Sequence, residues 1–236
     1  MAYFRYSRSI IDQFPTTRGG VIHATGLVNT STSPALLEAF ETEQQSVVEE
    51  LRDTPVSEIE SLVAWRRAFA AFGVKPTQYR NAAEALLRRL TKQGNVPSIN
   101  PLVDVANLVS LRCQLPVAVF DQHSVVGTTT VRFALGNEQF TDLGSDTITH
   151  PEPGEVVFVD DDGVVSARRW CWRQSAQSAA RPSTVDALIT VEGQHPEAMA
   201  DVTTATNDLL ALFSEHQPQA DLTSAIVTPE SSQFPT

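Results

Sequence analysis

Residues 100–121, NPLVDVANLVSLRCQLPVAVFD, constrain the fold more than any other stretch, because polar side chains recur there at helical spacing within an apolar segment. Asn100, Asp104 and Asn107 are four and three residues apart, so on a helix they point in nearly one direction. Asn100 stands before a proline, a pairing typical of a helix start. The stretch predicts a helix whose polar stripe needs partners, followed by a buried strand over residues 115–120.

Apolar periodicity predicts the other elements of the chain. We expect helices over residues 34–52, 58–72, 81–93 and 197–216, and strands over residues 21–24, 128–134, 155–160 and 164–172. Asp162 and Gly163 form a strong hairpin signal between the last two strands. We therefore interpret the DDD sequence at residues 160–162 as a turn rather than a cation site. Helices followed by strands indicate an α+β fold.

The same pattern predicts how the chain is organised. A strand and helix over residues 1–57 should pack on a main domain over residues 58–216, and residues 217–236 should form a loose polar tail. At 236 residues the chain can bury a large core.

Composition excludes several classes of protein. No apolar run approaches the roughly 20 residues that cross a bilayer, and the N-terminus has no signal-peptide core, so we expect a cytoplasmic protein without a membrane partner. Cys113 and Cys171 indicate neither a disulfide framework nor a metal cluster, and the five histidines show no metal spacing. No ATP-binding or dinucleotide signature is present, so we expect no metal, no cofactor and no ATP.

Basic residues are concentrated in the middle of an acidic chain. The net charge is −11, yet residues 66–181 hold 13 basic and 11 acidic side chains, whereas residues 182–236 hold 0 and 8. Near the start of this middle part, one acidic residue, Glu84, accompanies seven basic ones: Arg66, Arg67, Lys75, Arg80, Arg88, Arg89 and Lys92. Two interpretations remain open, a phosphate-binding patch for tRNA and ordinary solvated helix faces.

The sequence VVSARRWCWRQ at residues 164–174 is a second candidate for chemistry. Strand alternation puts two sets of side chains on opposite faces. These sets are Arg168, Trp170 and Trp172 on one face, and Arg169, Cys171 and Arg173 on the other. The tryptophans could stack on a terminal adenine or pack in the core, and the arginines could grip a ligand or pair with buried carboxylates such as Asp104 and Glu155.

Several of these segments resemble the B3/B4 domain of the bacterial phenylalanyl-tRNA synthetase beta subunit, and the whole pattern resembles freestanding members of that family. The matching segments are VDVANLV at 103–109, QLP at 114–116, VFD at 119–121, Gly127 with VRFA at 131–134, and STVD at 183–186 through Glu192. The resemblance is dense over residues 58–192. It implies an α+β fold with a β-sandwich-containing core and flanking helices.

The resemblance also implies a function in translation fidelity. The synthetase domain hydrolyses the ester that joins a wrong amino acid to the 3′ end of tRNA. Such a reaction needs a positioned water, a side-chain pocket and oxyanion donors, and no nucleophilic triad. By motif position, Asn100, Asp104, Asn107, Glu155, Arg169 and Arg173 are the catalytic candidates, and Arg132, Arg168, Trp170 and Trp172 are the substrate-binding candidates.

Two departures from the synthetase pattern alter the pocket. Ala118 stands where the synthetase motif has a histidine, and RRWCWRQS replaces a glycine-rich loop, so the tyrosine specificity of that domain does not carry over. Two hypotheses therefore stand, a trans-acting aminoacyl-tRNA deacylase that is not itself a ligase, and a non-catalytic binder of tRNA or of a free amino acid or small molecule. The pattern specifies neither the amino acid, nor the tRNA, nor the oligomeric state.

Overall fold

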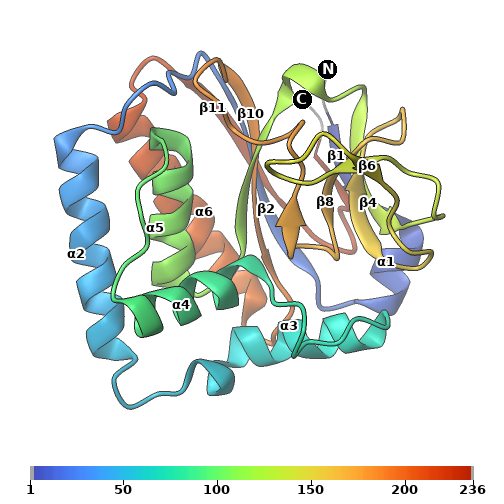
Figure 1. Ribbon diagram of the computed structural model, residues 1–236, viewed down its shortest axis with the longest axis horizontal. Helices are drawn as coiled ribbons and strands as arrows, with labels where there is room; N and C mark the ends of the chain where they lie inside the picture. The colour runs from blue at the N-terminus through green and yellow to red at the C-terminus, as the bar shows by residue number, and fades with distance from the viewer. Residues whose placement is uncertain (1–2, 235–236) are drawn as a thin grey trace.

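The computed structural model describes residues 3–234 and shows a mixed α/β fold built on two packed β-sheets, as the sequence predicts (Figure 1). The helices are α1 (Arg8–Gln13), α2 (Pro34–Glu50), η1 (Val56–Glu58), α3 (Glu60–Ala71), α4 (Ala82–Gln93), α5 (Pro101–Cys113), η2 (Gln122–Ser124) and α6 (Ala198–His216). The strands are β1 (Tyr3–Tyr6), β2 (Arg18–Thr25), β3 (Val117–Asp121), β4 (Thr128–Phe133), β5 (Phe140–Thr141), β6 (Ile148–Thr149), β7 (Val156–Val159), β8 (Val165–Arg168), β9 (Arg173–Gln174), β10 (Asp186–Gly193), β11 (Asp221–Val227) and β12 (Gln233–Phe234).

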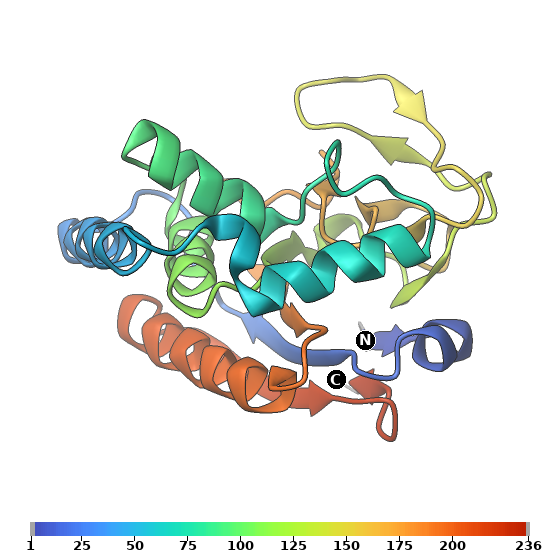
Figure 2. The same ribbon diagram turned by 90° about the horizontal axis from the view of Figure 1, so that it is seen from below.

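The layers follow from which face of each strand is apolar. A four-stranded antiparallel sheet has the order β11-β2-β10-β3, and a six-stranded sheet has the order β12-β1-β4-β7-β8-β9. Ile22 and Ile189 pack against the helices, whereas Val21 and Leu188, their neighbours in sequence, pack against the six-stranded sheet. The four-stranded sheet is therefore buried on both faces. In Figure 2, α6 lies along one side of this sheet, α3 crosses the end nearest the viewer, and the β5–β6 hairpin projects from the rest.

Two glycines of β2 allow close packing on both faces of the four-stranded sheet. A Cβ atom at Gly20 would lie 1.9 Å from Oγ1 of Thr206, so a glycine is needed there for α6 to approach the sheet. On the opposite face, a Cβ atom at Gly19 would lie 2.3 Å from the Tyr6 hydroxyl. Gly19 thus leaves room for a tyrosine between the sheets.

Local capping determines where the helices begin and end. The side chains of Ser33, Asn81 and Asn100 accept hydrogen bonds from amides in the first turns of α2, α4 and α5. Gly94 ends α4 with a φ of 81°. The predicted starts at Asn81 and Asn100 and the stop at Gly94 are confirmed. Within residues 3–234, no helix combines the length and the apolar character required to cross a bilayer.

The predicted strand over residues 164–172 is wrong beyond Arg168. β8 ends there, and Arg169 and Trp170 have left-handed backbone φ angles of 47° and 61°. The chain turns and returns as β9, which pairs with β8. Strand alternation therefore does not continue, and Arg169 and Arg173 do not share the face that a continuous strand would give them. The hairpin turn at Gly163 between β7 and β8 is confirmed, with a φ of 82°.

The loose tail predicted for residues 217–236 is also wrong for the part that the structure describes. β11 pairs with β2 along its length, and β12 pairs with β1. β11 shows little apolar alternation, because an edge strand can be held by its backbone pairing with β2 without a continuous apolar face. The N-terminal segment likewise contributes β1 and β2 to the two sheets.

Asp104 is buried in α5, but no arginine within residues 3–234 pairs with it as the sequence suggested. Its carboxylate accepts hydrogen bonds from Oγ1 of Thr32 and Oγ of Ser98, both at 2.6 Å, and from the amide of Ile99 at 2.8 Å. Neutral donors and the N-terminal end of a helix together stabilise a carboxylate without a cation. Asp104 therefore holds the preceding loop and the Thr32 segment against α5.

We expect Asp104→Ala to lower the free energy of unfolding by about 2–4 kcal/mol, because three donors lose a charged acceptor. Asp146→Ala is the matched control, since Asp146 is exposed, and it should stay within about 0.5 kcal/mol of the parent. Urea denaturation measures both variants. Equal midpoints for the parent and Asp104→Ala would show that the carboxylate contributes nothing to stability.

Candidate functional site

A small cavity lies between the two sheets where β3 and β10 face the turn that joins β8 and β9. Its volume is about 80 Å³, and its wall includes Ala118 of β3, Thr190 and Glu192 of β10, and Trp170 and Trp172 of the turn. We call it the Glu192 cavity. It has room for a few water molecules or a small side chain, because one water needs roughly 10–15 Å³.

Among the described residues that line this cavity, Glu192 alone is acidic, and it is 2% exposed. Tyr6 donates a hydrogen bond of 2.7 Å from its hydroxyl to Oε1, and the indole nitrogen of Trp170 donates one of 2.9 Å to the same oxygen. Among the residues that the structure describes, no donor contacts Oε2. That oxygen is therefore the part of Glu192 available to a ligand in the cavity.

Burial raises the pKa of the Glu192 carboxyl to about 7, although the hydrogen bonds from Trp170 and Tyr6 oppose this shift. A carboxyl with such a pKa exchanges its proton near neutral pH, as a general acid or base must. Burial, together with the nearby Glu192, also raises the pKa of the Cys171 thiol well above its usual value. Cys171 is therefore unsuited to act as a thiolate nucleophile.

Trp170 reaches the cavity because the backbone adopts an unusual conformation. Two successive non-glycine residues with positive φ cost of the order of 1–3 kcal/mol each, and such strain persists only where packing compensates for it. The Trp170 ring is fully buried and packs edge-on against Trp65 and Phe14, with ring centres 5.1 Å apart in both pairs. Of the two predicted roles for Trp170, core packing is the one that its contacts support.

Trp172 and two arginines lie together on the half-buried side of the cavity. The guanidinium carbons of Arg169 and Arg173 lie 4.6 and 4.8 Å from the centre of the Trp172 ring. The Tyr79 ring packs edge-on against Trp172, and its centre lies 4.0 Å from the guanidinium carbon of Arg169. Arg173 is exposed and pairs with Asp142 at 3.0 Å. This group, the Trp172 cluster, offers planar cations and an aromatic ring next to the cavity.

Other predicted site residues belong to ion pairs away from the cavity wall. Glu155 accepts two hydrogen bonds from Arg168, at 3.0 and 2.9 Å, and pairs with Arg169 at 2.8 Å. Arg132 pairs with the buried Glu138. Burial would raise the pKa of the Glu138 carboxyl, but hydrogen bonds from backbone amides and Arg132 lower it to about 2. The structural arginine–carboxylate network, one of the two predicted alternatives, is the one found at Glu155.

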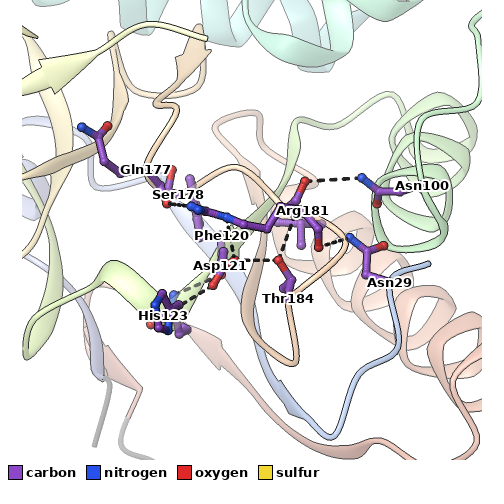
Figure 3. A network of polar contacts seen from close by, with 12 residues as sticks. Asn29, Asn100, Phe120, Asp121, His123, Gln177, Ser178, Arg181 and Thr184 are labelled. Carbon is purple, nitrogen blue, oxygen red and sulfur yellow. Dashed lines mark hydrogen bonds and ion pairs between the residues drawn. The ribbon is translucent and has the colours of Figure 1, made fainter. Parts of the chain in front are cut away.

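The polar residues of the family-like motifs hold a loop in place. Asp121 accepts a hydrogen bond of 2.6 Å from Oγ1 of Thr184 and lies 3.4 Å from Nε of Arg181 (Figure 3). The side-chain nitrogen of Asn100 lies 3.5 Å from the carbonyl oxygen of Ala180. These contacts tie residues 175–184 to β3 and to the start of α5. Asn100 and Asn107 both lie on or next to α5, and neither lines the Glu192 cavity.

The predicted basic patch divides into two groups. Arg66, Arg80 and Arg88 all contact the buried carboxylate of Glu84. The remaining members are exposed, namely Arg67, Lys75, Arg89 and Lys92.

In the sequence, Glu192 ends a family-like segment, but neither Glu192 nor Tyr6 is among the predicted site residues. The signal was present for Glu192, because alternation along β10 places it on the same face as Leu188 and Thr190. No local signal marks Tyr6, which is 186 positions away in the chain.

We expect the stability of the protein to depend on pH through Glu192. The unfolded chain binds this proton with an ordinary pKa of 4.5 and the folded chain with a pKa of about 7, so the folded state holds more protons between these values. Stability from the protonated carboxyl is therefore present below about pH 4.5 and is lost as the pH rises to about 7. Relative to Glu192→Gln, the parent should lose about 3 kcal/mol across this range. Urea denaturation at each pH measures the free energy of unfolding of the parent and the variant. If the two free energies change with pH in parallel, the raised pKa of Glu192 is contradicted.

Comparison with known proteins agrees with the sequence motifs. The chain is 31% identical over 94 residues to a phenylalanine–tRNA ligase beta subunit from Fusobacterium nucleatum subsp. nucleatum, a match that covers 39% of this chain and 11% of that subunit. It also resembles the crystal structure of an N-terminal fragment of the phenylalanyl-tRNA synthetase beta-subunit from Pyrococcus horikoshii, with a TM-score of 0.48 and 10% identity over 95% of this chain and 54% of the fragment. The B3/4 domain model matches residues 64–217, so the chain belongs to the B3/4 domain family.

Proposed function

We propose that this protein is a trans-acting aminoacyl-tRNA deacylase that hydrolyses the ester between a wrongly attached amino acid and the tRNA 3′ end. The observation that carries the proposal is Glu192, a buried carboxyl with a pKa of about 7 and one oxygen free in a cavity. The name of the relative that matches in sequence, a phenylalanine–tRNA ligase beta subunit, supports tRNA as the class of ligand.

The proposed reaction uses Glu192 as a general base. A water molecule attacks the carbonyl carbon of the ester, and its proton passes to Oε2 of the ionised carboxylate. The tetrahedral intermediate then collapses, the bond to the ribose oxygen breaks, and the proton moves from Glu192 to that oxygen. The products are a free amino acid and a tRNA with a free terminal hydroxyl.

Neighbouring residues supply the remaining requirements of this reaction. Thr190 lies two residues from Glu192 on the same face of β10, roughly 6–7 Å along the strand, and its hydroxyl is the proposed donor to the developing oxyanion. Tyr6 and Trp170 fix the carboxyl through Oε1, so that Oε2 is held toward the cavity. The Trp172 cluster is the proposed platform for the terminal adenosine. In this proposal Asn100, Asp104 and Glu155 have structural roles, and Asn107 takes no part in the reaction.

A second candidate function is binding without chemistry. Ala118 lines the cavity at the position of the histidine in the synthetase motif, and Trp170 occupies the position of its glycine-rich loop. A pocket with these two changes could retain an amino acid or an aminoacyl end without hydrolysing it. A hydrolysis assay separates the two functions.

We expect purified protein to hydrolyse at least one mischarged tRNA faster than the buffer control, in a panel that covers all twenty amino acids. Glu192→Gln keeps the shape and the hydrogen bonds to Tyr6 and Trp170 but cannot accept a proton, so kcat should fall by about 10²–10⁴-fold with little change in KM. Glu215→Gln is the matched control, because Glu215 is exposed on α6. If the whole panel stays at the buffer rate while tRNA still binds, the non-catalytic function replaces this one.

We also expect small amino acids to be the preferred substrates. Trp170 leaves a cavity of about 80 Å³, so glycyl, alanyl and seryl esters should fit, whereas phenylalanyl and tyrosyl esters should not. The measurement is kcat/KM for each ester on the same tRNA. Faster hydrolysis of tyrosyl-tRNA than of alanyl-tRNA would show that the cavity does not receive the side chain.

A further inference from the structure

A second and larger concavity lies between α4 and residues 51–57. Its volume is about 710 Å³, and its wall carries four basic side chains and one acidic side chain, which are Arg52, Arg80, Arg88, Lys92 and Asp53. We call it the arginine cavity. Its charge contrasts with the net charge of −11 on the whole chain.

One buried carboxylate holds the arginines behind this cavity in place. Glu84 is 1% exposed and accepts hydrogen bonds from Arg66 at 3.0 and 2.6 Å and from Nε of Arg88 at 2.7 Å. Nε of Arg80 lies 3.4 Å from the same carboxylate. Burial would raise the pKa of the Glu84 carboxyl, but the hydrogen bonds from Arg66 and Arg88 outweigh it and lower the pKa below its usual value.

This arrangement leaves positive charge and free donors facing the cavity. Three guanidinium groups share one carboxylate, so two positive charges are not neutralised by it. Arg80 and Arg88 contact Glu84 through Nε, and the described residues accept no hydrogen bond from their terminal nitrogens. A guanidinium that is already held in place loses less freedom when it binds a phosphate, and its planar fork matches phosphate oxygens.

Helix α4 connects the arginine cavity to the Glu192 cavity. The amide of Ala82, at the start of α4, donates a hydrogen bond of 2.8 Å to the carbonyl oxygen of Cys171, and both residues line the Glu192 cavity. Arg80 precedes this point by two residues, and Arg88 and Lys92 follow along the helix. From Ala82 to Lys92 the helix rises about 15 Å. Both cavities can thus contact one extended nucleic-acid strand.

We propose that the arginine cavity binds backbone phosphates of the RNA strand whose 3′ end enters the Glu192 cavity. The identity of that 3′ end rests on the proposed function, whereas the phosphate contacts rest on the arginines alone. A strand of RNA is narrow enough to follow α4 into the cavity. An anionic membrane is a broad surface and would also meet the acidic remainder of the protein, which repels it.

The test compares charge reversals at exposed positions, because changes beside the buried Glu84 risk unfolding. Arg52 lines the cavity and forms a surface ion pair with Glu49 three residues away. Arg8, on α1, forms a similar surface pair with Asp12 four residues away. Arg52→Glu and Lys92→Glu, singly and together, are the test variants, and Arg8→Glu is the matched control. Binding of deacylated tRNA is measured from low to high salt, with circular dichroism to confirm folding.

In a plot of log affinity against log salt concentration, the slope for the double variant should be smaller in magnitude by about 1.4. Each phosphate contact to a single strand contributes about 0.7 to that slope. At physiological salt this loss corresponds to an increase of about tenfold in Kd. The control should keep both the slope and the Kd of the parent. An unchanged slope in the folded double variant would overturn the proposal.

Two further outcomes separate this inference from the proposed function. If no mischarged tRNA is hydrolysed but the double variant still flattens the slope, the phosphate site stands and only the deacylase fails. Vesicles of phosphatidylcholine and phosphatidylserine are the second probe. The RNA assignment would be overturned if the parent binds these vesicles but not tRNA, and the double variant no longer binds the vesicles.

Discussion

The hydrogen bonds that Tyr6 and Trp170 donate to Glu192 join the two sheets at the centre of the molecule. Tyr6 belongs to β1 of the six-stranded sheet, Glu192 to β10 of the four-stranded sheet, and Trp170 to the turn after β8. A carboxyl between two sheets is costly unless it is bonded or protonated. This arrangement depends on Gly19, which leaves space for Tyr6, and on the strained turn, which places Trp170.

Buried carboxylates also organise the arginines, which explains how an acidic protein presents a basic surface. Glu84 holds three of them, and Glu155 holds Arg168 and Arg169. Removing one partner of such a buried group leaves an uncompensated charge, so each network is structurally constrained. The networks nevertheless differ in their surroundings, because Arg80 and Arg88 of the Glu84 network line the arginine cavity, whereas neither Arg168 nor Arg169 is among its described residues. Charge counts along the chain cannot distinguish the two cases.

Predictions from the sequence were accurate where the controlling contacts are local. Asn81 and Asn100 cap their helices within three residues, and Gly163 turns a hairpin between adjacent strands. The strand predicted through Trp172 was wrong, because the alternating pattern of side chains continues in the sequence whereas the backbone turns after Arg168. Packing of Trp170 against Trp65 and Phe14 compensates for the positive φ angles that end β8. Those aromatic partners are 105 and 156 positions away.

The sequence by itself therefore determined the α+β class, the helix caps and the family-like motifs, because each depends on neighbouring residues or on a short pattern. Only the tertiary structure decided which polar residues meet. Asp104 meets hydroxyl groups and an amide where an arginine was expected, and Glu192 meets Tyr6 across the sandwich. A side chain's partner depends on how strands distant in sequence register and pack, and a buried carboxyl accepts any suitable donor that packing supplies.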